Sequence, residues 1–269
     1  MKKQILLLTA FFLIGTAFAQ EKLYLSLGVG GGFGTAASYD FSTNGDKAHP
    51  VALGKGFDVM LRGGYFVNDF MAVELGVGYR KGFNTKINLD VFSNNGLTLD
   101  GNGTLKISGN MLEIVPALVI SPNLGSKTIR PYTRLGVIIG VMNSINTKDD
   151  ETILGHTINF NLKCSGGVAV GGSAALGADF NLGKMFSLYA EIIYDALSYA
   201  PTKGKFTKFE ADGVDMLPDM KTCDKEVKFV KDLTGYTPQD GEPSQELKNS
   251  YPFNSLGLNI GVKIKLGNK

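Results

Sequence analysis

Six charged side chains are expected at middle heights on one face of segments whose other face is apolar. They are Arg62, Glu74, Glu113, Arg134, Glu191 and Lys263, three of each sign. In a narrow, water-poor interior such charges pair with one another, because an unpaired buried charge costs several kcal/mol. These residue types therefore predict an ion-pair network. Arg62 and Glu74 lie at similar distances from the turn between their segments and are the expected direct pair.

Histidine is the usual base of hydrolytic sites, and the chain has two, His49 and His156. His49 precedes Pro50 and has no adjacent Ser or carboxylate. The tripeptide His156-Thr157-Ile158 lacks the His-x-Ser pattern of lipid A deacylases. Both histidines are expected in solvated loops, so no catalytic residue is predicted.

The two cysteines, Cys164 and Cys223, are expected on the same side of the molecule, where an exported protein can form a disulfide. Two separated Cys and two separated His make no metal-ligand cluster, so neither a metal nor a cofactor is predicted. The glycine run 28–34 has Phe33 where a dinucleotide loop needs Gly, and no helix follows. A formal net charge of +2 gives no electrostatic basis for nucleic-acid binding.

An export signal is predicted over residues 1–19. Lys2 and Lys3 precede a short apolar stretch, and small residues precede Gln20. The mature chain would then comprise residues 20–269. Mean hydropathy is +0.04 and charged residues make up 19%, which suits strands with one apolar face and one polar face.

Eight segments alternate with the period of a β-strand. They cover residues 22–32, 55–66, 71–82, 107–120, 131–142, 167–180, 186–197 and 254–266. Each is long enough for a tilted strand to cross a membrane. The last segment is the clearest, with Leu258, Ile260 and Val262 on one face and Asn259 and Lys263 on the other.

The connections between these segments alternate in length. Long ones cover 33–54, 83–106, 143–166 and 198–253, and short ones cover 67–70, 121–130 and 181–185. An all-β, eight-stranded antiparallel up-and-down transmembrane barrel has this arrangement, with four long extracellular loops and three short periplasmic turns. The fourth loop, 198–253, is long enough to hold order of its own, and a short helix is expected within 212–233.

Charges assign the two faces of each strand. Arg62 and Glu74 must point inward, which leaves the apolar face outward, toward lipid. A soluble barrel with an apolar interior is the alternative, but its polar face would carry more Lys and Glu than is found here. A bulge is expected at Pro116, which cannot donate to the strand ladder. Tyr and Phe near the strand ends, including Tyr132 and Tyr199, are candidates for interfacial girdles.

The pattern as a whole resembles the small eight-stranded outer-membrane barrels similar to OmpA's transmembrane domain and to OmpX. The resemblance extends from the strand at 22–32 through 174–180 to 257–266 and rests on periodicity more than on an invariant motif. The chain departs from this family in lacking a terminal aromatic residue and a following peptidoglycan-binding domain. The resemblance implies residence in the outer membrane of a Gram-negative bacterium.

The lumen of an eight-stranded barrel is just wide enough to be filled by side chains. We therefore expect a non-enzymatic, monomeric barrel that is plugged by ion pairs and carries loops for adhesion, surface interaction or envelope integrity. Outer-membrane lipid, lipopolysaccharide and an unidentified extracellular partner are the expected contacts. The alternatives are a narrow passive pore for ions or small solutes and a lipid-modifying outer-membrane enzyme.

Overall fold

The computed structural model describes residues 22–35, 39–43, 47–94, 97–122 and 128–266. The predicted export signal at 1–19 lies outside the described residues. Helices in the described chain are short, and none has the length and apolar character needed to span a membrane.

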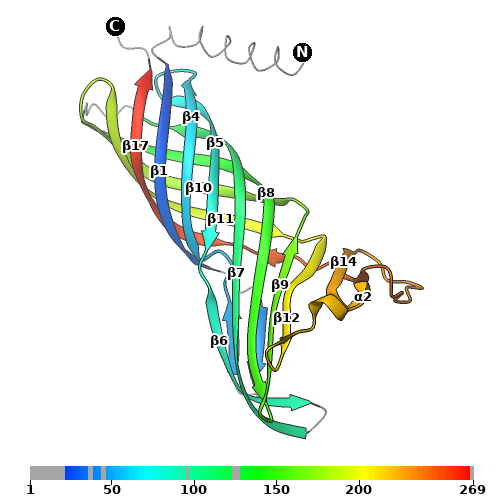
Figure 1. Ribbon diagram of the computed structural model, residues 1–269. Coiled ribbons are helices and arrows are strands. Elements are labelled where there is room, and N and C mark those ends of the chain that lie inside the picture. The colour runs from blue at the N-terminus through cyan, green and yellow to red at the C-terminus, as the bar shows by residue number, and fades with distance from the viewer. Residues whose placement is uncertain (1–21, 36–38, 44–46, 95–96, 123–127, 267–269) are drawn as a thin grey trace.

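A closed ring of antiparallel strands forms the body of the molecule (Figure 1). In order around the ring, its strands are β1 (Leu23–Gly34), β4 (Gly56–Phe66), β5 (Met71–Gly82), β7 (Leu97–Ile120), β8 (Ile129–Ile153), β10 (Ala169–Asn181), β11 (Phe186–Tyr199) and β17 (Ser255–Leu266). Each strand pairs with the next, and β17 pairs back with β1 along its full length, from Leu23 opposite Leu266 to Gly34 opposite Ser255. These pairings confirm the eight-stranded up-and-down barrel.

Alternation along each strand gives the ring an apolar outer surface. On β5, for example, Val73, Leu75 and Val77 are exposed whereas Glu74 is buried. The same outward belt continues on other strands through Leu25, Leu27, Val29, Val59, Leu61, Leu135, Val137, Leu176, Leu188, Ile192, Leu258, Ile260 and Val262. An apolar exterior around a charged interior is the reverse of a soluble barrel and suits a lipid environment.

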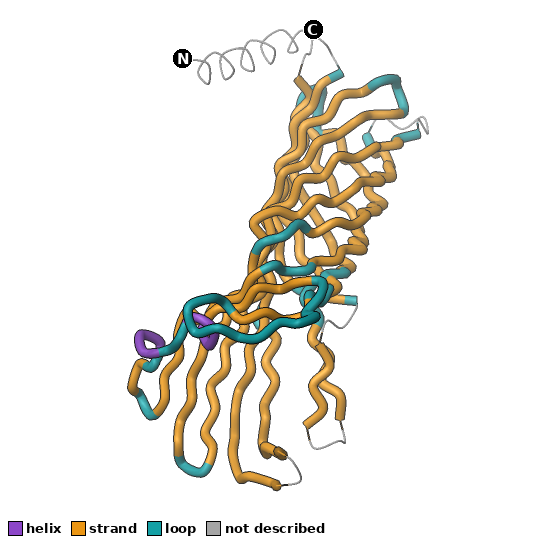
Figure 2. The backbone as a smooth tube through the Cα atoms, turned by 90° about the vertical axis from the view of Figure 1, so that its right-hand side faces the viewer, coloured by secondary structure: helices purple, strands orange, loops and turns teal. Residues whose placement is uncertain are grey.

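Beyond one end of the ring, β7 and β8 continue and carry an open sheet, which we call the extension (Figures 1 and 2). Its strands, in order, are β6 (Thr85–Asn94), β7, β8, β9 (His156–Ser165), β12 (Lys203–Ala211), β14 (Glu226–Val230) and β15 (Ser244–Leu247). The start of β1 and the end of β17 lie at the opposite end of the ring (Figure 1).

The segments 83–106, 143–166 and 198–253 contain strands, so the prediction that they are loops was wrong. The first two fold back as strands on β7 and β8, so that Ile107 pairs with Thr147 and Thr147 pairs with Leu162. A hairpin of β2 (Tyr39–Thr43) and β3 (Lys47–Val51) lies in the connection between β1 and β4. Apolar and polar residues still alternate in these segments. Their apolar side chains point to the inner face and their polar side chains point outward, which is the reverse of the barrel strands, and the segments therefore resembled polar loops.

The segment 198–253 carries further short elements. These are β12, β13 (Val214–Asp215), the 3-10 turn η1 (Leu217–Asp219), α2 (Thr222–Lys225), β14, β15 and β16 (Tyr251–Pro252). The helix expected within 212–233 is therefore only four residues long. Val227 and Val230 lie on β14 instead, where Val227 pairs with Gly204 of β12, since β-branched residues favour a strand.

The strand irregularity lies at Met142 and not at Pro116. Leu75 pairs with Pro116 in unbroken register, and on the other side the pairing with β8 skips Val115 and Pro116 without a register shift, in keeping with the donor that proline lacks. Between β7 and β8 the register shifts at Asn110 to Leu112, where β8 holds an extra residue. Met142 has a φ of 53° and an 83% exposed side chain. The extra residue changes which β8 side chains point inward. Within the ring the even-numbered residues point inward, whereas in the extension Asn143, Ile145 and Asp149 do so.

Candidate functional site: the barrel lumen

A central layer of two arginines and two glutamates crosses the lumen. Arg134 Nε lies 2.7 Å from Glu74 Oε1, and Arg134 Nη1 contacts Glu191 Oε2. Arg62 Nη2 lies 3.1 Å from Glu191 Oε1, whereas Arg62 Nε is 3.7 Å from Glu74 Oε1. All four side chains are buried, so each charge depends on its partners.

The expected pair of Arg62 with Glu74 is thus the longest contact of this layer. The β4–β5 register explains the distance, because Arg62 lies opposite Gly76 and Glu74 lies opposite Gly64. The two side chains are diagonal neighbours, which leaves Glu191 on the far wall as the closer partner of Arg62.

Toward the extension, Arg80 forms a second layer. Its Nε lies 2.8 Å from Glu113 Oε1, its Nη2 donates to Asp195 Oδ2 and its Nη1 donates to Ser255 Oγ at 2.9 Å. Glu113 is therefore paired, but with Arg80, which the sequence-based network omitted.

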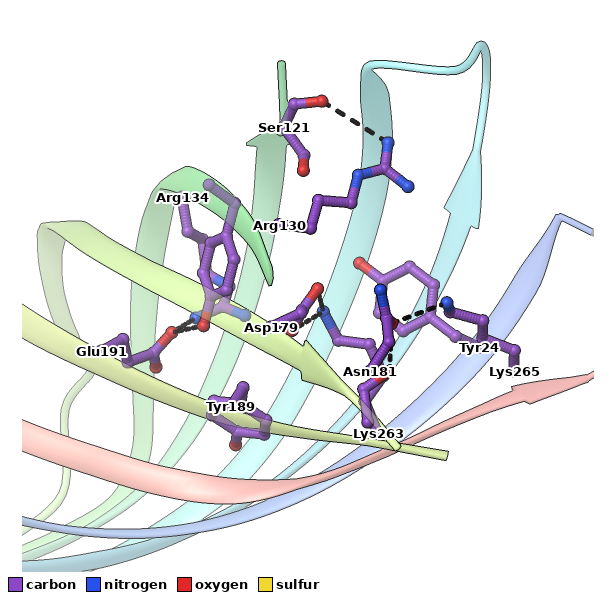
Figure 3. A network of polar contacts seen from close by, with 12 residues as sticks. Tyr24, Ser121, Arg130, Arg134, Asp179, Asn181, Tyr189, Glu191, Lys263 and Lys265 are labelled. Carbon is purple, nitrogen blue, oxygen red and sulfur yellow. Dashed lines mark hydrogen bonds and ion pairs between the residues drawn. The ribbon is translucent and has the colours of Figure 1, made fainter. Parts of the chain in front are cut away.

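Toward the short turns, Lys263 forms a third layer. Its Nζ donates to both carboxylate oxygens of Asp179 at 2.7 Å. The ammonium also faces the rings of Tyr24, Tyr132 and Tyr189, with Nζ-to-centroid distances of 4.9, 5.0 and 6.0 Å. Figure 3 shows Lys263 directed toward Asp179 and Lys265 directed toward Asn181.

The tyrosines connect the layers. Tyr24 donates to Glu74 Oε2 at 2.8 Å and Tyr132 donates to Glu191 Oε2 at 2.7 Å, while Tyr189 accepts from Arg62 Nη1 at 2.8 Å. Tyr132 and Tyr199, both expected in girdles, are buried and point inward.

Inward glycines make room for these rings. A Cβ on Gly64 would stand 2.1 Å from Tyr24 Cζ, and one on Gly28 would stand 1.9 Å from Tyr189 Oη. Glycine therefore permits an aromatic ring to lie against the neighbouring strands of the same wall. The rings of Tyr24 and Tyr189 thereby occupy space inside the lumen.

Where the ring meets the extension, an apolar cluster that we call the cap fills the interior. It contains Val51, Leu53, Met60, Ile87, Leu105, Ile107, Met111, Val115, Ile138, Ile145, Ala169, Leu197, Tyr199 and Phe253. Phe253 packs edge-on against Tyr199 with 5.9 Å between ring centroids. A Cβ on Gly109 would stand 2.3 Å from Phe253 Cε1, so Gly109 admits the ring.

The predicted network of six residues left out four further charged side chains of the lumen. Arg80, Asp58, Asp179 and Asp195 also face the lumen. The alternation of each strand shows from the sequence that these side chains point inward. Their positions along the barrel axis depend on the offset between neighbouring strands, which the sequence does not show. The six predicted residues fall into separate layers for the same reason, and only Arg62, Glu74, Arg134 and Glu191 form one cluster.

Cys164 and Cys223 are free thiols in the structure, contrary to the predicted bridge. Cys164 packs against the cap from β9, whereas Cys223 lies on α2, with its Sγ 3.7 Å from Asp224 Oδ1. Burial raises the pKa of the Cys164 thiol to about 11, which disfavours the reactive thiolate.

His156 lies at an exposed hairpin tip, as expected of a solvated residue. Its Nδ1 is 2.8 Å from Asp212 Oδ2, and this contact holds the pKa of Asp212 below its usual range. Thr157 N also donates to Asp212 Oδ1 at 2.8 Å. The contact joins the β8–β9 tip to the turn after β12. His49 lies on β3, and within the described residues no group of three or more His, Cys, Asp or Glu side chains is arranged as a metal site.

Comparison with known families decides the class of this barrel. The family model described as "Outer membrane protein beta-barrel domain" matches residues 5–217. The chain belongs to this family. As an outer membrane protein beta-barrel, it resides in the outer membrane of a Gram-negative bacterium. In bacterial barrels of this kind the short turns are periplasmic and the longer connections are extracellular.

Individual proteins of known structure are only distantly similar to this chain. No curated protein matches. Among solved structures, the outer membrane protein OprG from Pseudomonas aeruginosa is 15% identical, with 93% of this chain and 98% of that chain covered and a TM-score of 0.41. Neisserial surface protein A is 12% identical, with 90% and 96% covered and a TM-score of 0.37. Ail from Yersinia pestis is 11% identical, with 91% and 99% covered and a TM-score of 0.32.

The extension of this outer membrane barrel carries lysines on the face that continues the lipid-facing surface. Lys86, Lys106 and Lys148 lie directly opposite one another on β6, β7 and β8. Lys106 Nζ contacts Asp150 Oδ2 at 3.0 Å, whereas Lys86 and Lys148 are exposed. Like charges placed directly opposite each other destabilise a sheet. This row therefore costs stability and is a candidate contact site.

Proposed function

We propose that the protein is a non-enzymatic outer-membrane anchor. In this proposal its lumen is closed, and its working part is the extracellular extension, whose lysine row contacts anionic groups of the surrounding lipopolysaccharide. The observation that carries the proposal is the continuity of β7 and β8, which run from the membrane wall into the extension without a break.

Closure of the lumen is supported at several heights. Tyrosines and ion pairs fill the periplasmic half, and Arg80 with its carboxylates fills the outer half. The apolar cap then covers the extracellular end. A hydrated ion would have to displace paired charges and then cross an apolar layer, and both steps are unfavourable.

Strand continuity makes the extension a fixed platform. A surface held by the hydrogen-bond ladder of the barrel loses little conformational freedom when it binds a partner, whereas a flexible loop must first be ordered. The membrane-embedded wall thereby fixes the height and direction of the extension above the lipid.

The lysine row supports an anionic partner close to the membrane. On β7 the outward face changes from Leu112 to Asn110 and then reaches Lys106 six residues beyond Leu112. At the rise of a β-strand this separation is about 20 Å along the chain. Phosphate groups of lipopolysaccharide are the anionic groups that surround an outer-membrane barrel at its extracellular surface.

Conductance in planar bilayers tests the closed lumen. The refolded wild type should be electrically silent, and so should Lys148→Ala, a control that alters charge only on the extension. Arg62→Ala leaves Glu191 and Glu74 with one cation fewer, admits water and should produce transient openings. Steady channels in the wild type would reject the anchor and favour the passive pore.

Binding to purified lipopolysaccharide tests the working surface. Lys86→Ser combined with Lys148→Ser should weaken binding about tenfold and reduce its dependence on salt, because two phosphate contacts are lost. Lys184→Ser combined with Lys231→Ser removes the same charge away from the row and should bind like the wild type. Equal affinity for all three proteins would remove the lysine row from the proposal.

A further inference from the structure

The lumen charges balance in the central layer and in the layer of Lys263, but they do not balance in the layer of Arg80, which we call the outer layer. Lys263 faces Asp179, and the central layer has two arginines and two glutamates. In the outer layer one guanidinium, that of Arg80, meets three carboxylates, those of Asp58, Glu113 and Asp195. Buried carboxylates without compensation are unfavourable, so this layer has a deficit of positive charge.

A small cavity lies within this layer. Its polar lining includes Asp58, Arg80, Asp195, Ser255 and Asn259, and it has room for about one water molecule. Asp58 is partly exposed and makes neither a hydrogen bond nor an ion pair at contact distance among the described residues. Its carboxylate is therefore available to a ligand in the cavity.

Two further oxygens in the cavity lining lack partners. Asp195 Oδ1 and Asn259 Oδ1 accept no hydrogen bond, although each residue is only 3% exposed. The amide nitrogen of Asn259 donates to Glu191 Oε1 at 3.4 Å, which leaves its carbonyl oxygen turned toward the cavity side. Buried acceptors without donors are costly, and a bound cation would satisfy both of them.

The glycine run lets these oxygens converge. The position of a Cβ on Gly30 would be 1.6 Å from Asn259 Oδ1 and 2.9 Å from Asp58 Oδ1. Both oxygens therefore approach the same point above Gly30, where any other residue would fill the space. Gly31 and Gly32 also line the cavity. The glycine run that had no role in phosphate binding thus forms one wall of this site.

We propose that the cavity binds one small monovalent cation of the Na⁺ class through Asp58 Oδ1, Asn259 Oδ1 and Asp195 Oδ1. Oxygen-only ligands suit a hard cation, and the volume excludes a large one. Only two carboxylates reach the ion, in keeping with the absence of a three-carboxylate metal group among the described residues, so a tight divalent site is not expected. The bound ion compensates the charge deficit of the outer layer.

Unfolding in matched salts tests the cation. Refolded wild type is unfolded by urea in NaCl or in choline chloride at equal ionic strength, because choline is too large for the cavity. The midpoint should be higher in NaCl. Once Na⁺ exceeds its dissociation constant, the unfolding equilibrium constant should fall about tenfold for each tenfold rise in Na⁺, as binding of one ion requires.

Asp58→Asn should remove the difference between the two salts, whereas Asp215→Asn on the exposed strand β13 should retain it. Equal wild-type midpoints in NaCl and choline chloride would overturn the site, and so would a difference that persists in Asp58→Asn. The wild-type comparison remains decisive even if Asp58→Asn does not refold. A midpoint that follows pH but not the cation would assign the missing positive charge to a proton and reject the ion.

Discussion

The barrel and the extension are one continuous sheet with opposite polarity. In the barrel, apolar side chains such as Leu112 face outward and Glu113 faces inward. In the extension, Ile107 and Leu105 of the same strand are buried on the inner face, while Lys106 lies on the outer face. The solvent outside changes from lipid to water between these positions, and the strand changes its pattern accordingly.

The two strands achieve this inversion differently. On β7 the odd-numbered residues point inward along the whole strand, and only the residue types on each face change. On β8 the extra residue at Met142 shifts the parity by one, so that Ile145 points inward above the bulge. A bulge is a local means of changing side-chain direction without ending the strand.

Deletion of Val141 together with Met142 should break this comparison most severely. Removal of the bulged residue and one more shifts the alternation of β8 by one residue relative to β7, so Asn146, Lys148 and Asp150 would point toward the apolar inner face, and Ile145 would point outward. The extension should then lose its fold while the barrel below persists. Proteolysis should remove the extension, and a barrel that still migrates differently before and after boiling should remain.

Deletion of Met142 alone is the matched control for this double deletion. It removes only the bulged residue, so Asn143 and Ile145 still point inward and the extension should be as resistant to protease as in the wild type. Protease resistance of the double-deletion variant would show that the alternation of β8 does not set the polarity of the extension.

Removal of Glu191 should have the next largest effect and should fall on the barrel alone. Glu191→Ala leaves Arg62 and Arg134 buried beside Glu74 as their remaining carboxylate and removes the acceptor of Tyr132. Truncation of one partner in a buried ion network costs about 3–5 kcal/mol. Urea unfolding of the refolded barrel measures the loss, with Glu246→Ala on the extension as the control. A loss below about 1 kcal/mol would contradict a network that stabilises the wall.

Truncation of the cap should affect both regions at once. Phe253→Ala removes a fully buried ring at the junction and costs about 3 kcal/mol. Leu256→Ala, on the exposed outer face nearby, should cost much less in detergent. Hydrogen exchange should show faster opening of both upper β7 and β11 in Phe253→Ala. Faster opening of only one region would show that the cap does not join them.

Sequence periodicity could locate the barrel strands because each strand has one face toward lipid and the other toward the polar lumen. Leu258, Ile260 and Val262 alternate with inward residues for this reason, and their strand is predicted almost to its ends. The same criterion failed for the extension. Its outer face meets water, so Lys106 and Lys148 look like loop residues unless the reversal of polarity is recognised.

The sequence could predict which residues contribute charges to the lumen but not which of them pair with one another. Arg62 and Glu191 are separated by 129 positions in the chain, and their contact depends on the barrel stagger, which no local pattern records. Arg80 and Asp195 were left out of the network because their height in the lumen cannot be read from parity. The six predicted residues contain three charges of each sign, so the excess of carboxylates in the outer layer was not apparent from them.

A change of pH should separate the two regions in the mildest way. Asp149 is buried on the inner face of the extension, and burial, with Glu151 beside it, raises the pKa of its carboxyl to about 7. The folded extension therefore favours the protonated form, and the stability that this form contributes is lost as pH rises from about 4 through about 7. Proteolysis of the extension, corrected for cleavage of an unfolded substrate at each pH, should be faster at pH 9 than at pH 5.5. Asp149→Asn should abolish this difference and Asp150→Asn should retain it. A pH effect that survives Asp149→Asn would place the titrating group elsewhere.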